Sequence, residues 1–354
     1  MKEALLYESL TKAQVICRLC AHNCQISDGK FGFCGIRQNI GGILFTHSYG
    51  HLVALQSDPV EKKPLYHFFP GSAAFSIASA GCNFRCGFCQ NWGISQINCT
   101  LPVSKTASGK KTKELDTIKQ QMGELFSAEK VVALAKAHEC RSIAYTYTEP
   151  TVSWEFVLET AKLAHESGLK NILVTNGYFT AAAFSLLKPY LDAVNLDLKF
   201  FQDRSYEKIC AAHLTPVLDS LRLLVSAGVW VEVTTLIIPG VNDSLKELAE
   251  IAKFIAELNL DIPWHISRFH ADYKFNNYPD TPESSLKLAY DLGKKAGLNY
   301  IYAGNISGWG QDTYCPACHK VLIKREGFRI TEINLLANLC SFCQASLPGF
   351  FNPL

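Results

Sequence analysis

Short hydrophobic runs alternate with longer amphipathic stretches between residues 73 and 303. The short runs are rich in β-branched and aromatic residues, as strands are, and they lie at 73–80, 142–147, 171–175, 193–198, 230–236, 263–267 and 299–303. The stretches between them, such as VVALAKAH and SLKELAEIAKFIAELN, repeat hydrophobic residues with helical spacing, and several end at glycine. Strands that are hydrophobic on both faces and are each followed by a helix predict a parallel sheet of right-handed βαβ units. The predicted fold class is therefore α/β, and about six or seven such units favour a partial (β/α)6 barrel of the TIM type.

Two cysteine-bearing segments flank this pattern and predict three parts in the chain. Residues 1–57 form a cysteine-rich N-terminal module, residues 58–310 form the core barrel, and residues 311–354 form a small C-terminal module. Within the core, residues 100–125 are polar, rich in lysine and only weakly periodic. A segment of this kind indicates an insertion loop.

Composition narrows the class of protein. Of the 354 residues, 48% are hydrophobic and 19% are charged, and the formal net charge is +2. The balanced charge gives no electrostatic reason to expect a nucleic acid or an anionic membrane as partner. The N-terminal sequence MKEALLYESLTKAQ has no hydrophobic core of signal-peptide length, and no later run reaches the length of a membrane span, so a cytoplasmic protein is expected. In that reducing compartment the 14 cysteines are expected to bind metals rather than form disulfides, because most of them fall into three groups.

The central cysteine group, in SAGCNFRCGFCQNW, directly follows the predicted strand 73–80. The thiolates of Cys82, Cys86 and Cys89 can bind three irons of a [4Fe-4S] cluster and leave the fourth iron open, as a catalytic centre requires. In parallel α/β barrels the chemistry lies on loops at the carboxyl ends of strands, and this loop has that position. The alternatives are a zinc site with a distant fourth ligand, or three buried cysteines without metal. Zinc sites favour C-x2-C pairs, whereas the first gap here has three residues, so the pattern favours the cluster.

The outer cysteine groups each supply four thiolates. Two C-x2-C pairs at the C-terminus are separated by VLIKREGFRITEIN and its flanks, a predicted hairpin with a Glu-Gly turn, and consist of Cys315, Cys318, Cys340 and Cys343. This pattern predicts a tetrathiolate site like that of a zinc ribbon or a rubredoxin, with structural zinc favoured over iron. The N-terminal group, which leaves zinc and an iron–sulfur cluster equally open, consists of Cys17, Cys20, Cys24 and Cys34. Three further cysteines stand alone and are expected to be packed without a role: Cys99, Cys140 and Cys210.

The chain resembles the radical S-adenosylmethionine (SAM) superfamily, through the C-x3-C-x2-C loop after the first barrel strand. Within it, the chain resembles the branch of pyruvate formate-lyase-activating enzymes, and more closely the radical SAM member of the AmmeMemoRadiSam system. The motifs that carry this resemblance are EKKPLYHFFPG, AYTYTEP, TNGY, NLDLKFF, TTLIIPGVND, PWHISRF and the terminal cysteine pairs.

The resemblance implies a radical SAM barrel with a [4Fe-4S] cluster and SAM as cofactors. The open iron would chelate SAM, and one electron would cleave it to methionine and a 5′-deoxyadenosyl radical that removes a hydrogen atom from the substrate. It also implies a low-potential electron donor such as ferredoxin or flavodoxin. Two kinds of substrate are compatible with the resemblance. One is a glycine of a partner protein, as in glycyl-radical-enzyme activating enzymes, and the other is a small molecule or peptide. The insertion and the extra cysteine modules favour an unassigned substrate.

The same resemblance, together with positions at predicted strand ends, suggests contacts to SAM from Phe88, Glu149, Asn176, Asp197, Lys199, Thr234, His265 and Arg268. Phe88 matches the position beside the adenine. Glu149 matches a contact to the methionine amino group, although two glycines of the family motif are Tyr147 and Thr148 here. Asn176 follows the third strand, where it could equally be a turn residue.

The remaining suggested contacts also have structural alternatives. Asp197 and Lys199 share one face of a strand, where they would meet the cofactor or form a mutual ion pair. His265 matches a histidine that contacts SAM, although a lone histidine is more often a hydrogen-bonded structural residue. Arg268 could bind a carboxylate or brace a loop.

Two other classes of function are compatible with part of the sequence. An electron-transfer protein with several iron centres would need fully ligated clusters, which the open triplet argues against. A nucleic-acid binder built on the C-terminal ribbon would need clustered basic residues, and Lys320, Lys324 and Arg325 are few for that purpose.

Overall fold

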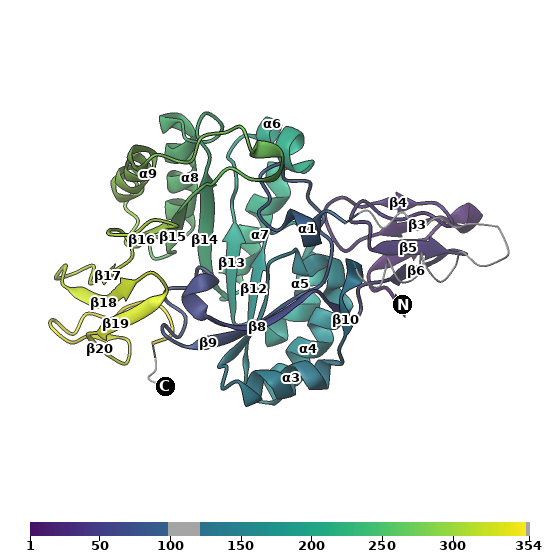
Figure 1. The fold of residues 1–354 in the computed structure, drawn as a ribbon, viewed down its shortest axis with the longest axis horizontal. Coiled ribbons are helices and arrows are strands. Elements are labelled where there is room, and N and C mark those ends of the chain that lie inside the picture. The colour runs from purple at the N-terminus through teal and green to yellow at the C-terminus, as the bar shows by residue number, and fades with distance from the viewer. Residues whose placement is uncertain (98–120, 352–354) are drawn as a thin grey trace. The chain divides into compact units, whose positions relative to one another are not determined.

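The computed structural model describes residues 1–97 and 121–351 (Figure 1). Cys99 and most of the predicted insertion at 100–125 therefore lie outside the described residues. The chain divides into two compact units. The first comprises residues 1–57, 75–85 and 89–191, and the second comprises residues 58–74, 86–88 and 192–354. The three-part division expected from the cysteine pattern stays a prediction.

The N-terminal part of the first unit consists of short antiparallel strands. They are β1 (Lys2–Glu3), β2 (Tyr7–Ser9), β3 (Val15–Cys17), β4 (Gln25–Ile26), β5 (Arg37–Ile40), β6 (Ile43–Thr46) and β7 (His51–Leu52), with a 3-10 turn at Thr11–Ala13. They form two small sheets in the orders β1-β6-β5 and β2-β3-β4, while β7 pairs with β10 (Glu124–Leu125). Val15 of β3 and Leu44 of β6 are fully buried. The inward-facing hydrophobic residues thus hold together strands that are too short to be stable alone.

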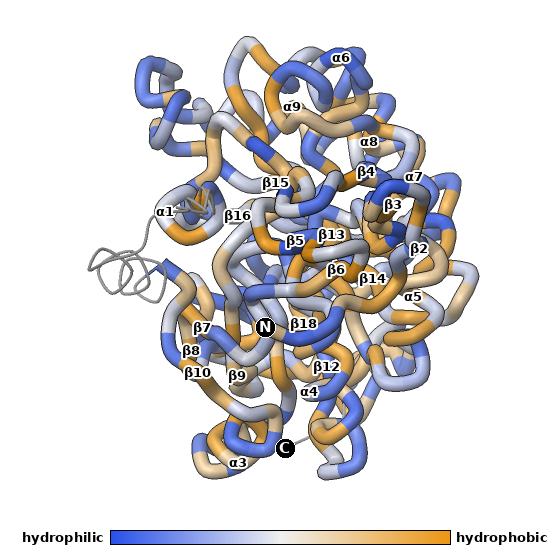
Figure 2. Tube along the Cα trace, turned by 90° about the vertical axis from the view of Figure 1, so that its right-hand side faces the viewer, coloured by the Kyte–Doolittle hydropathy of each residue, from blue (hydrophilic) through white to orange (hydrophobic). Residues whose placement is uncertain are grey.

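The rest of the first unit has strands followed by helices. The strands β8 (Ala54–Pro59), β9 (Ala73–Ala78), β11 (Ser142–Tyr145) and β12 (Lys170–Thr175) are neighbours in the order β12-β11-β9-β8. The helices are α1 (Trp92–Ser95), α3 (Ala128–Ala137), α4 (Trp154–Glu166) and α5 (Ala181–Leu187), with 3-10 turns at Pro150–Ser153 and Lys188–Tyr190. Strands β11 and β12 pair in parallel. The hydrophobic stretch of β12 is visible in Figure 2, and its residues Ile172 and Leu173 are buried.

The second unit repeats the strand-then-helix order. Its parallel strands β13 (Ala193–Asp197), β14 (Trp230–Ile237), β15 (Trp264–Arg268) and β16 (Ile301–Gly304) are adjacent in chain order. Its helices are α6 (Asp203–Ser205), a π-helix at Tyr206–Cys210, α7 (Leu214–Ser226), α8 (Leu245–Leu258) and α9 (Glu283–Lys295), with 3-10 turns at Val60–Lys62 and Tyr273–Phe275. Helix α8 buries Leu248, Ile251, Ala252 and Ile255, the spacing of one helical face. All seven predicted strands are present with their ends shifted by a few residues, so the prediction of an α/β fold with a parallel sheet is confirmed. Its closure into a barrel stays a prediction.

The C-terminal module contains β17 (Thr313–Tyr314), β18 (Val321–Glu326), β19 (Arg329–Ile333), β20 (Leu335–Leu336) and β21 (Leu339–Cys340). Strands β18 and β19 form the predicted hairpin, which turns at Gly327, a residue with φ of 62°.

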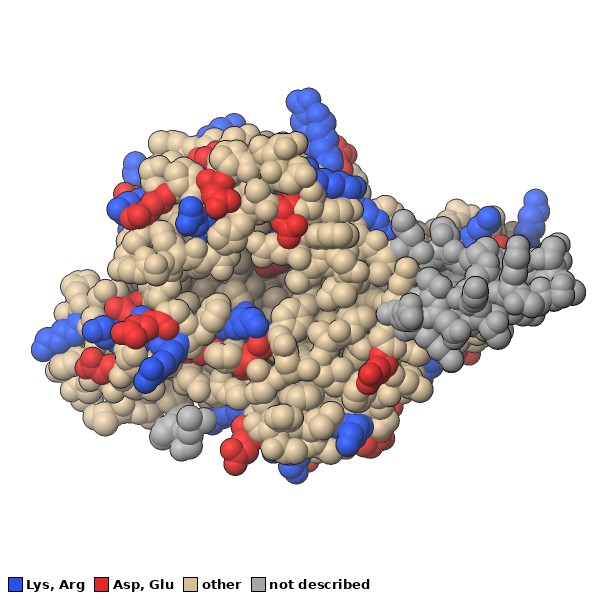
Figure 3. Space-filling view, in the orientation of Figure 1, with Lys and Arg blue, Asp and Glu red and all other residues tan. Residues whose placement is uncertain are grey.

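On the face drawn in Figure 3, basic and acidic side chains are interspersed. Across the part of the chain that the structure describes, no single helix is both long and apolar enough to cross a membrane. One pair, Asp203–Cys210 with Leu214–Ser226, meets that length and composition test only jointly, and it bends by 107° at its break.

Candidate functional site

The loop after β9 carries the three central cysteines. It begins at Gly81, whose φ of 98° and close packing against Ile36 exclude a side chain, because a Cβ there would lie 2.7 Å from that residue. Cys82 and Cys89 belong to the first unit, and Cys86 belongs to the second. The N–H of Phe84 donates to the Sγ of Cys82 at 3.3 Å, and the Sγ of Cys89 lies 3.2 Å from the Ser95 hydroxyl.

Cys86 is the most deeply packed of the three. It is buried, and its thiol donates to the Sγ of Cys210 at 3.4 Å. The next residue, Gly87, donates its N–H to the carbonyl of Ile209 at 3.2 Å and accepts from the N–H of Lys274. A Cβ at Gly87 would lie 2.6 Å from the Phe275 ring, so only glycine allows this close approach.

Phe88, the expected neighbour of the adenine, is buried in an aromatic setting. Its ring contacts the rings of Phe200 and Phe275 edge to face, each with centroids 5.9 Å apart. The ammonium of Lys199 lies 5.8 Å from the Phe88 ring centroid. At this distance the ammonium is attracted by the negative charge of the ring face.

The donor set of this loop fits an iron–sulfur cluster. All three cysteines are free of disulfides. Thiolates are the ligands that iron–sulfur clusters use, and hydrogen bonds to their sulfur atoms stabilise the negative charge that ligation places there. The N–H of Phe84 and the hydroxyl of Ser95 supply such groups for Cys82 and Cys89.

Glu149 and Asn176 lie together in the first unit. The Glu149 carboxylate is buried and accepts from the N–H and hydroxyl of Thr151, the Thr175 hydroxyl at 2.8 Å and the Asn176 N–H at 2.8 Å. Through the N–H of Thr151 it also caps the Pro150–Ser153 turn. The Asn176 amide donates to the Asn83 side chain at 2.7 Å and lies 4.0 Å from the Sγ of Cys82. Both residues therefore position the strand ends beside the cysteine loop.

Strand register aligns three of the suggested SAM contacts in the second unit. Asp197 of β13 lies opposite Thr234 of β14, which lies opposite His265 of β15. Lys199 forms an ion pair with Asp197 at 2.8 Å, and their side chains are 13% and 34% exposed. The hydroxyl of Thr234 is hydrogen-bonded to Asn195. The mutual ion pair thus forms, and contact of these two groups with SAM stays a prediction.

His265 makes a short contact that the sequence did not predict. Its Nε2 lies 2.6 Å from the carboxylate of Glu232, which also accepts from the backbone N–H groups of Tyr66 and His67. Burial raises the pKa of Glu232, but the hydrogen bond and charge of His265 outweigh it and hold that pKa below its ordinary value. A charged residue inside a hydrophobic strand is the signal that could have indicated Glu232.

Arg268 braces a loop in this structure. Its Nε donates to the carbonyl of Thr281 at 2.9 Å, and its side chain is 37% exposed and lies 3.9 Å from Asp280. Its backbone carbonyl accepts from the side chain of Asn305.

Comparison with known proteins decides the family. A model of the Radical SAM superfamily matches residues 76–255, a range that includes the cysteine loop. The chain belongs to the Radical SAM superfamily. It is therefore an enzyme, with a [4Fe-4S] cluster and SAM as cofactors.

The relatives of this radical SAM enzyme include proteins of known and unknown role. An uncharacterized protein of Methanocaldococcus jannaschii is 42% identical over 337 residues, which cover 95% of each chain. The pyruvate formate-lyase-activating enzyme of Clostridium pasteurianum is 24% identical over 214 residues, covering 56% of this chain and 80% of that enzyme. Among solved structures, SuiB of Streptococcus suis bound to S-adenosylmethionine covers 70% of this chain and 53% of its own, with 12% identity and a TM-score of 0.48. The resemblance to activating enzymes is thus confirmed, and membership in the AmmeMemoRadiSam branch stays a prediction.

The N-terminal cysteines of the radical SAM enzyme gather around one cavity. Cys17, Cys20, Cys24 and Cys34 line it together with Arg37. The buried Arg37 guanidinium lies 3.5 Å from the Sγ of Cys17 and pairs with the buried carboxylate of Glu155. A fixed positive charge next to the thiols would offset the negative charge of a thiolate site.

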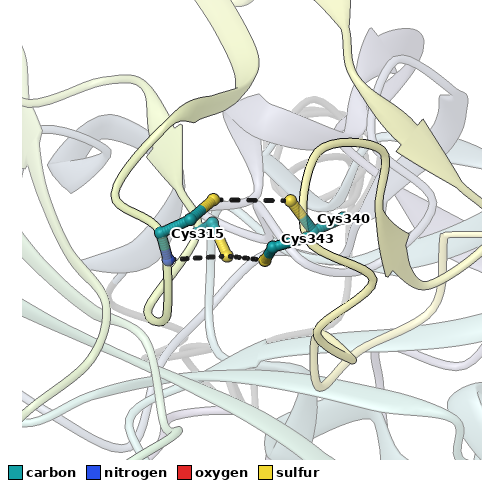
Figure 4. A group of neighbouring side chains, drawn as sticks. Cys315, Cys340 and Cys343 are labelled. Carbon is teal, nitrogen blue, oxygen red and sulfur yellow. Dashed lines mark hydrogen bonds between the residues drawn. The ribbon is translucent and has the colours of Figure 1, made fainter.

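The C-terminal cysteines converge more closely. The sulfur atoms of Cys315, Cys318, Cys340 and Cys343 all lie within 4.8 Å of one another. Figure 4 shows the thiols of the two C-x2-C pairs facing each other. The Sγ–Sγ distance is 3.6 Å for Cys315–Cys343 and 3.7 Å for Cys318–Cys340. Tetrahedral zinc with bonds of about 2.3 Å separates its sulfur ligands by about 3.8 Å, so these four thiols fit a single metal ion.

Proposed function

We propose that this enzyme binds its [4Fe-4S] cluster through Cys82, Cys86 and Cys89 and uses it to cleave S-adenosylmethionine reductively. When bound, the cluster and SAM together supply a 5′-deoxyadenosyl radical, with methionine as co-product, and the radical abstracts a hydrogen atom from the substrate. The observation that carries the proposal is the loop after β9 with three cysteines in C-x3-C-x2-C spacing, none of them in a disulfide, inside the range that matches the superfamily.

In this reaction the side chains of the protein would orient the cluster and SAM. Hydrogen bonds from Phe84 and Ser95 orient the sulfurs of Cys82 and Cys89. Phe88 and Lys199 offer an aromatic face and a cation to the nucleotide, and Asp197 offers a carboxylate to its hydroxyl groups. The Arg268 guanidinium suits a carboxylate of SAM or of the substrate.

Four of the suggested contact residues are hydrogen-bonded to other protein groups. Glu149, Asn176, Thr234 and His265 are all engaged by protein groups: Glu149 by Thr175 and Asn176, Thr234 by Asn195, and His265 by Glu232. We infer that these hydrogen bonds fix the positions of the strand ends. Their partners explain why polar side chains are stable there, because each buried polar group is hydrogen-bonded.

The reaction also needs an electron and a second reactant. A low-potential one-electron donor of the ferredoxin or flavodoxin class would supply the electron. For the substrate, the relatives named as activating enzymes support a glycine of a partner protein, whereas the two additional cysteine groups support a different, unassigned substrate. We favour the unassigned substrate, because two cysteine modules beyond the cluster loop suit a role that a minimal activating enzyme does not have.

The decisive experiment is anaerobic reconstitution with iron and sulfide, followed by dithionite reduction in the presence of SAM. The expected product is 5′-deoxyadenosine, detected by chromatography, and it should fall at least about 100-fold in Cys86→Ala, which removes a ligand of the cluster. Cys140→Ala is the matched control, since Cys140 is a buried lone cysteine in the first unit whose thiol contacts the carbonyl of His138. A reduced protein with full iron and sulfide content that yields no 5′-deoxyadenosine would overturn the proposal. Deuterium transfer from a candidate glycyl peptide into 5′-deoxyadenosine would identify the activating-enzyme alternative.

A further inference from the structure

The lone cysteine Cys210 faces one of the three cluster ligands. Its Sγ is 3.4 Å from the Sγ of Cys86, and both residues are buried in the second unit. The sequence predicted a packed cysteine without a role, because Cys210 is 124 residues away from Cys86 and belongs to no cysteine group.

Local structure directs this thiol toward the cluster loop. Cys210 is the last residue of the π-helix Tyr206–Cys210, and the next residue, Ala211, has a left-handed φ of 53°. A π-helix is uncommon and is frequently found at functional sites. The carbonyl of Ile209, one residue before Cys210, accepts the N–H of Gly87, one residue after Cys86. The π-helix and the cluster loop are thus joined by a backbone hydrogen bond directly beside the two thiols.

The same π-helix is anchored at its other end. The hydroxyl of the buried Tyr206 accepts the N–H of Lys199 at 3.0 Å, and its ring contacts Phe200 edge to face. Phe200 in turn contacts Phe88 of the loop. Cys210 is therefore held in a fixed position relative to Cys86.

Ligation decides which thiol can donate. The two sulfur atoms lie at hydrogen-bonding distance. A Cys86 that binds iron is a thiolate with no proton, so the S–H of Cys210 is the remaining donor between the two sulfurs. A donor to a ligand sulfur stabilises the reduced cluster, which carries more negative charge, better than the oxidised cluster, and so it raises the reduction potential.

We propose that Cys210 is a positioning residue that donates an S–H···S hydrogen bond to the cluster ligand Cys86 and makes the cluster easier to reduce. This inference rests on the proposed function, because it takes Cys86 as a ligand of the cluster. It assigns to Cys210 no iron of its own, which leaves the fourth iron open for SAM.

The test is a redox titration of the reconstituted protein, followed by the EPR signal of the reduced cluster. Cys210→Ala and the closer match in size, Cys210→Val, should both shift the midpoint potential to more negative values. Cys210→Ser keeps a donor and should stay closer to the wild type, and Cys140→Ala, the control in the first unit, should match the wild type. Because Cys210→Ala and Cys210→Val both lack the S–H donor, one of them can still be measured if the other packs poorly.

A second measurement detects the proton itself. Pulsed ENDOR of the reduced cluster in H2O and D2O should show an exchangeable proton coupling that is present in the wild type and in Cys140→Ala and lost in both Cys210→Ala and Cys210→Val. Cluster-loaded Ala and Val variants with the wild-type potential and the wild-type proton coupling would overturn the inference. A wild-type protein that assembles no cluster would overturn the proposed function instead, so the two failures are distinguishable.

Discussion

At the scale of single residues, the second unit buries a neutral histidine in a complete hydrogen-bond network. His67 is fully buried, and its Nδ1 lies 2.9 Å from the carbonyl of Pro348. A carbonyl can only accept, so Nδ1 carries the proton and Nε2 accepts from the Tyr302 hydroxyl at 2.6 Å. Burial lowers the pKa of His67 to about 4, against the opposing charge of Glu232. The sequence singled out the segment EKKPLYHFFPG without assigning a role to this residue; the structure shows a packing role.

The low pKa of His67 predicts acid sensitivity. The unfolded chain takes up the proton near pH 6.5 and the folded chain only near pH 4, so the stability from the neutral ring is complete above 6.5 and is lost as the pH falls to about 4. The free energy of unfolding of the wild type relative to His67→Gln should therefore fall by about 3 kcal/mol between pH 7 and pH 4. Urea unfolding followed by tryptophan fluorescence at several pH values measures this difference.

Other titratable or charged groups near His67 could also contribute to the pH dependence of the free energy of unfolding. Besides His67 they are Glu232, Arg325, Tyr302 and His265. The pKa of Glu232 is already depressed, so Glu232 adds a loss of stability only below its ordinary value of 4.5. The exposed His270 serves as control, and His270→Gln should keep the wild-type profile. A wild-type-to-His67→Gln difference that is constant across this range would contradict the network.

At the scale of elements, three helices begin at a side chain that caps the backbone. Ser127, Thr180 and Ser244 accept the N–H of the third residue that follows, at the starts of α3, α5 and α8. In α8 the sequence Ser-Leu-Lys-Glu has the form of a capping box, but Glu247 turns away to accept the N–H of Phe201. The cap therefore depends on Ser244 alone, and Glu247 ties the helix to the segment after β13.

Loss of the Ser244 cap predicts a small, local destabilisation. Ser244→Ala should lower the free energy of unfolding by about 1 kcal/mol, because it leaves the N–H of Glu247 without its acceptor. Ser244→Asp retains an acceptor at the same position and should stay within a few tenths of a kcal/mol of the wild type. Urea unfolding at neutral pH provides the comparison, and an Ala variant as stable as the Asp variant would show that the cap contributes nothing.

At the scale of the whole molecule, cysteine groups that could bind metal ions lie outside the cluster loop as well. The four C-terminal thiols surround a position suited to one tetrahedral ion, and two of them, Cys315 and Cys340, belong to a hydrophobic cluster with Leu322, Ile323 and Leu347. Because a module with so small a core buries little apolar surface, we expect a metal ion bound there to stabilise it. The N-terminal four cysteines line a cavity of their own next to Arg37.

Metal analysis of purified variants tests the C-terminal site. Cys315→Ser and Cys340→Ser should each lose one equivalent of zinc per chain, measured by inductively coupled plasma mass spectrometry, because three thiolates bind zinc far more weakly than four. Cys140→Ser should keep it. Finding iron in place of zinc would reassign the metal, and zinc content unchanged in both variants would exclude this site as its ligand set.

Local patterns in the sequence determined the elements and the cysteine groups of this protein. Strand and helix are visible along the chain because each has its own hydrophobic period, and C-x2-C spacing keeps two thiols close whatever the rest of the fold does. The seven predicted strands between residues 73 and 304, the β18–β19 hairpin and the C-terminal C-x2-C pairs were predictable for this reason.

Only the tertiary structure decided which side chains meet across long separations. Glu232 accepts from His265 and from two N–H groups at residues 66 and 67, Arg37 pairs with Glu155, and Cys210 faces Cys86. Each contact joins different elements, and its direction depends on strand register and helix geometry that no local pattern records. Burial then makes these pairings obligatory, because an isolated charge or donor inside the protein would cost more than the fold can supply.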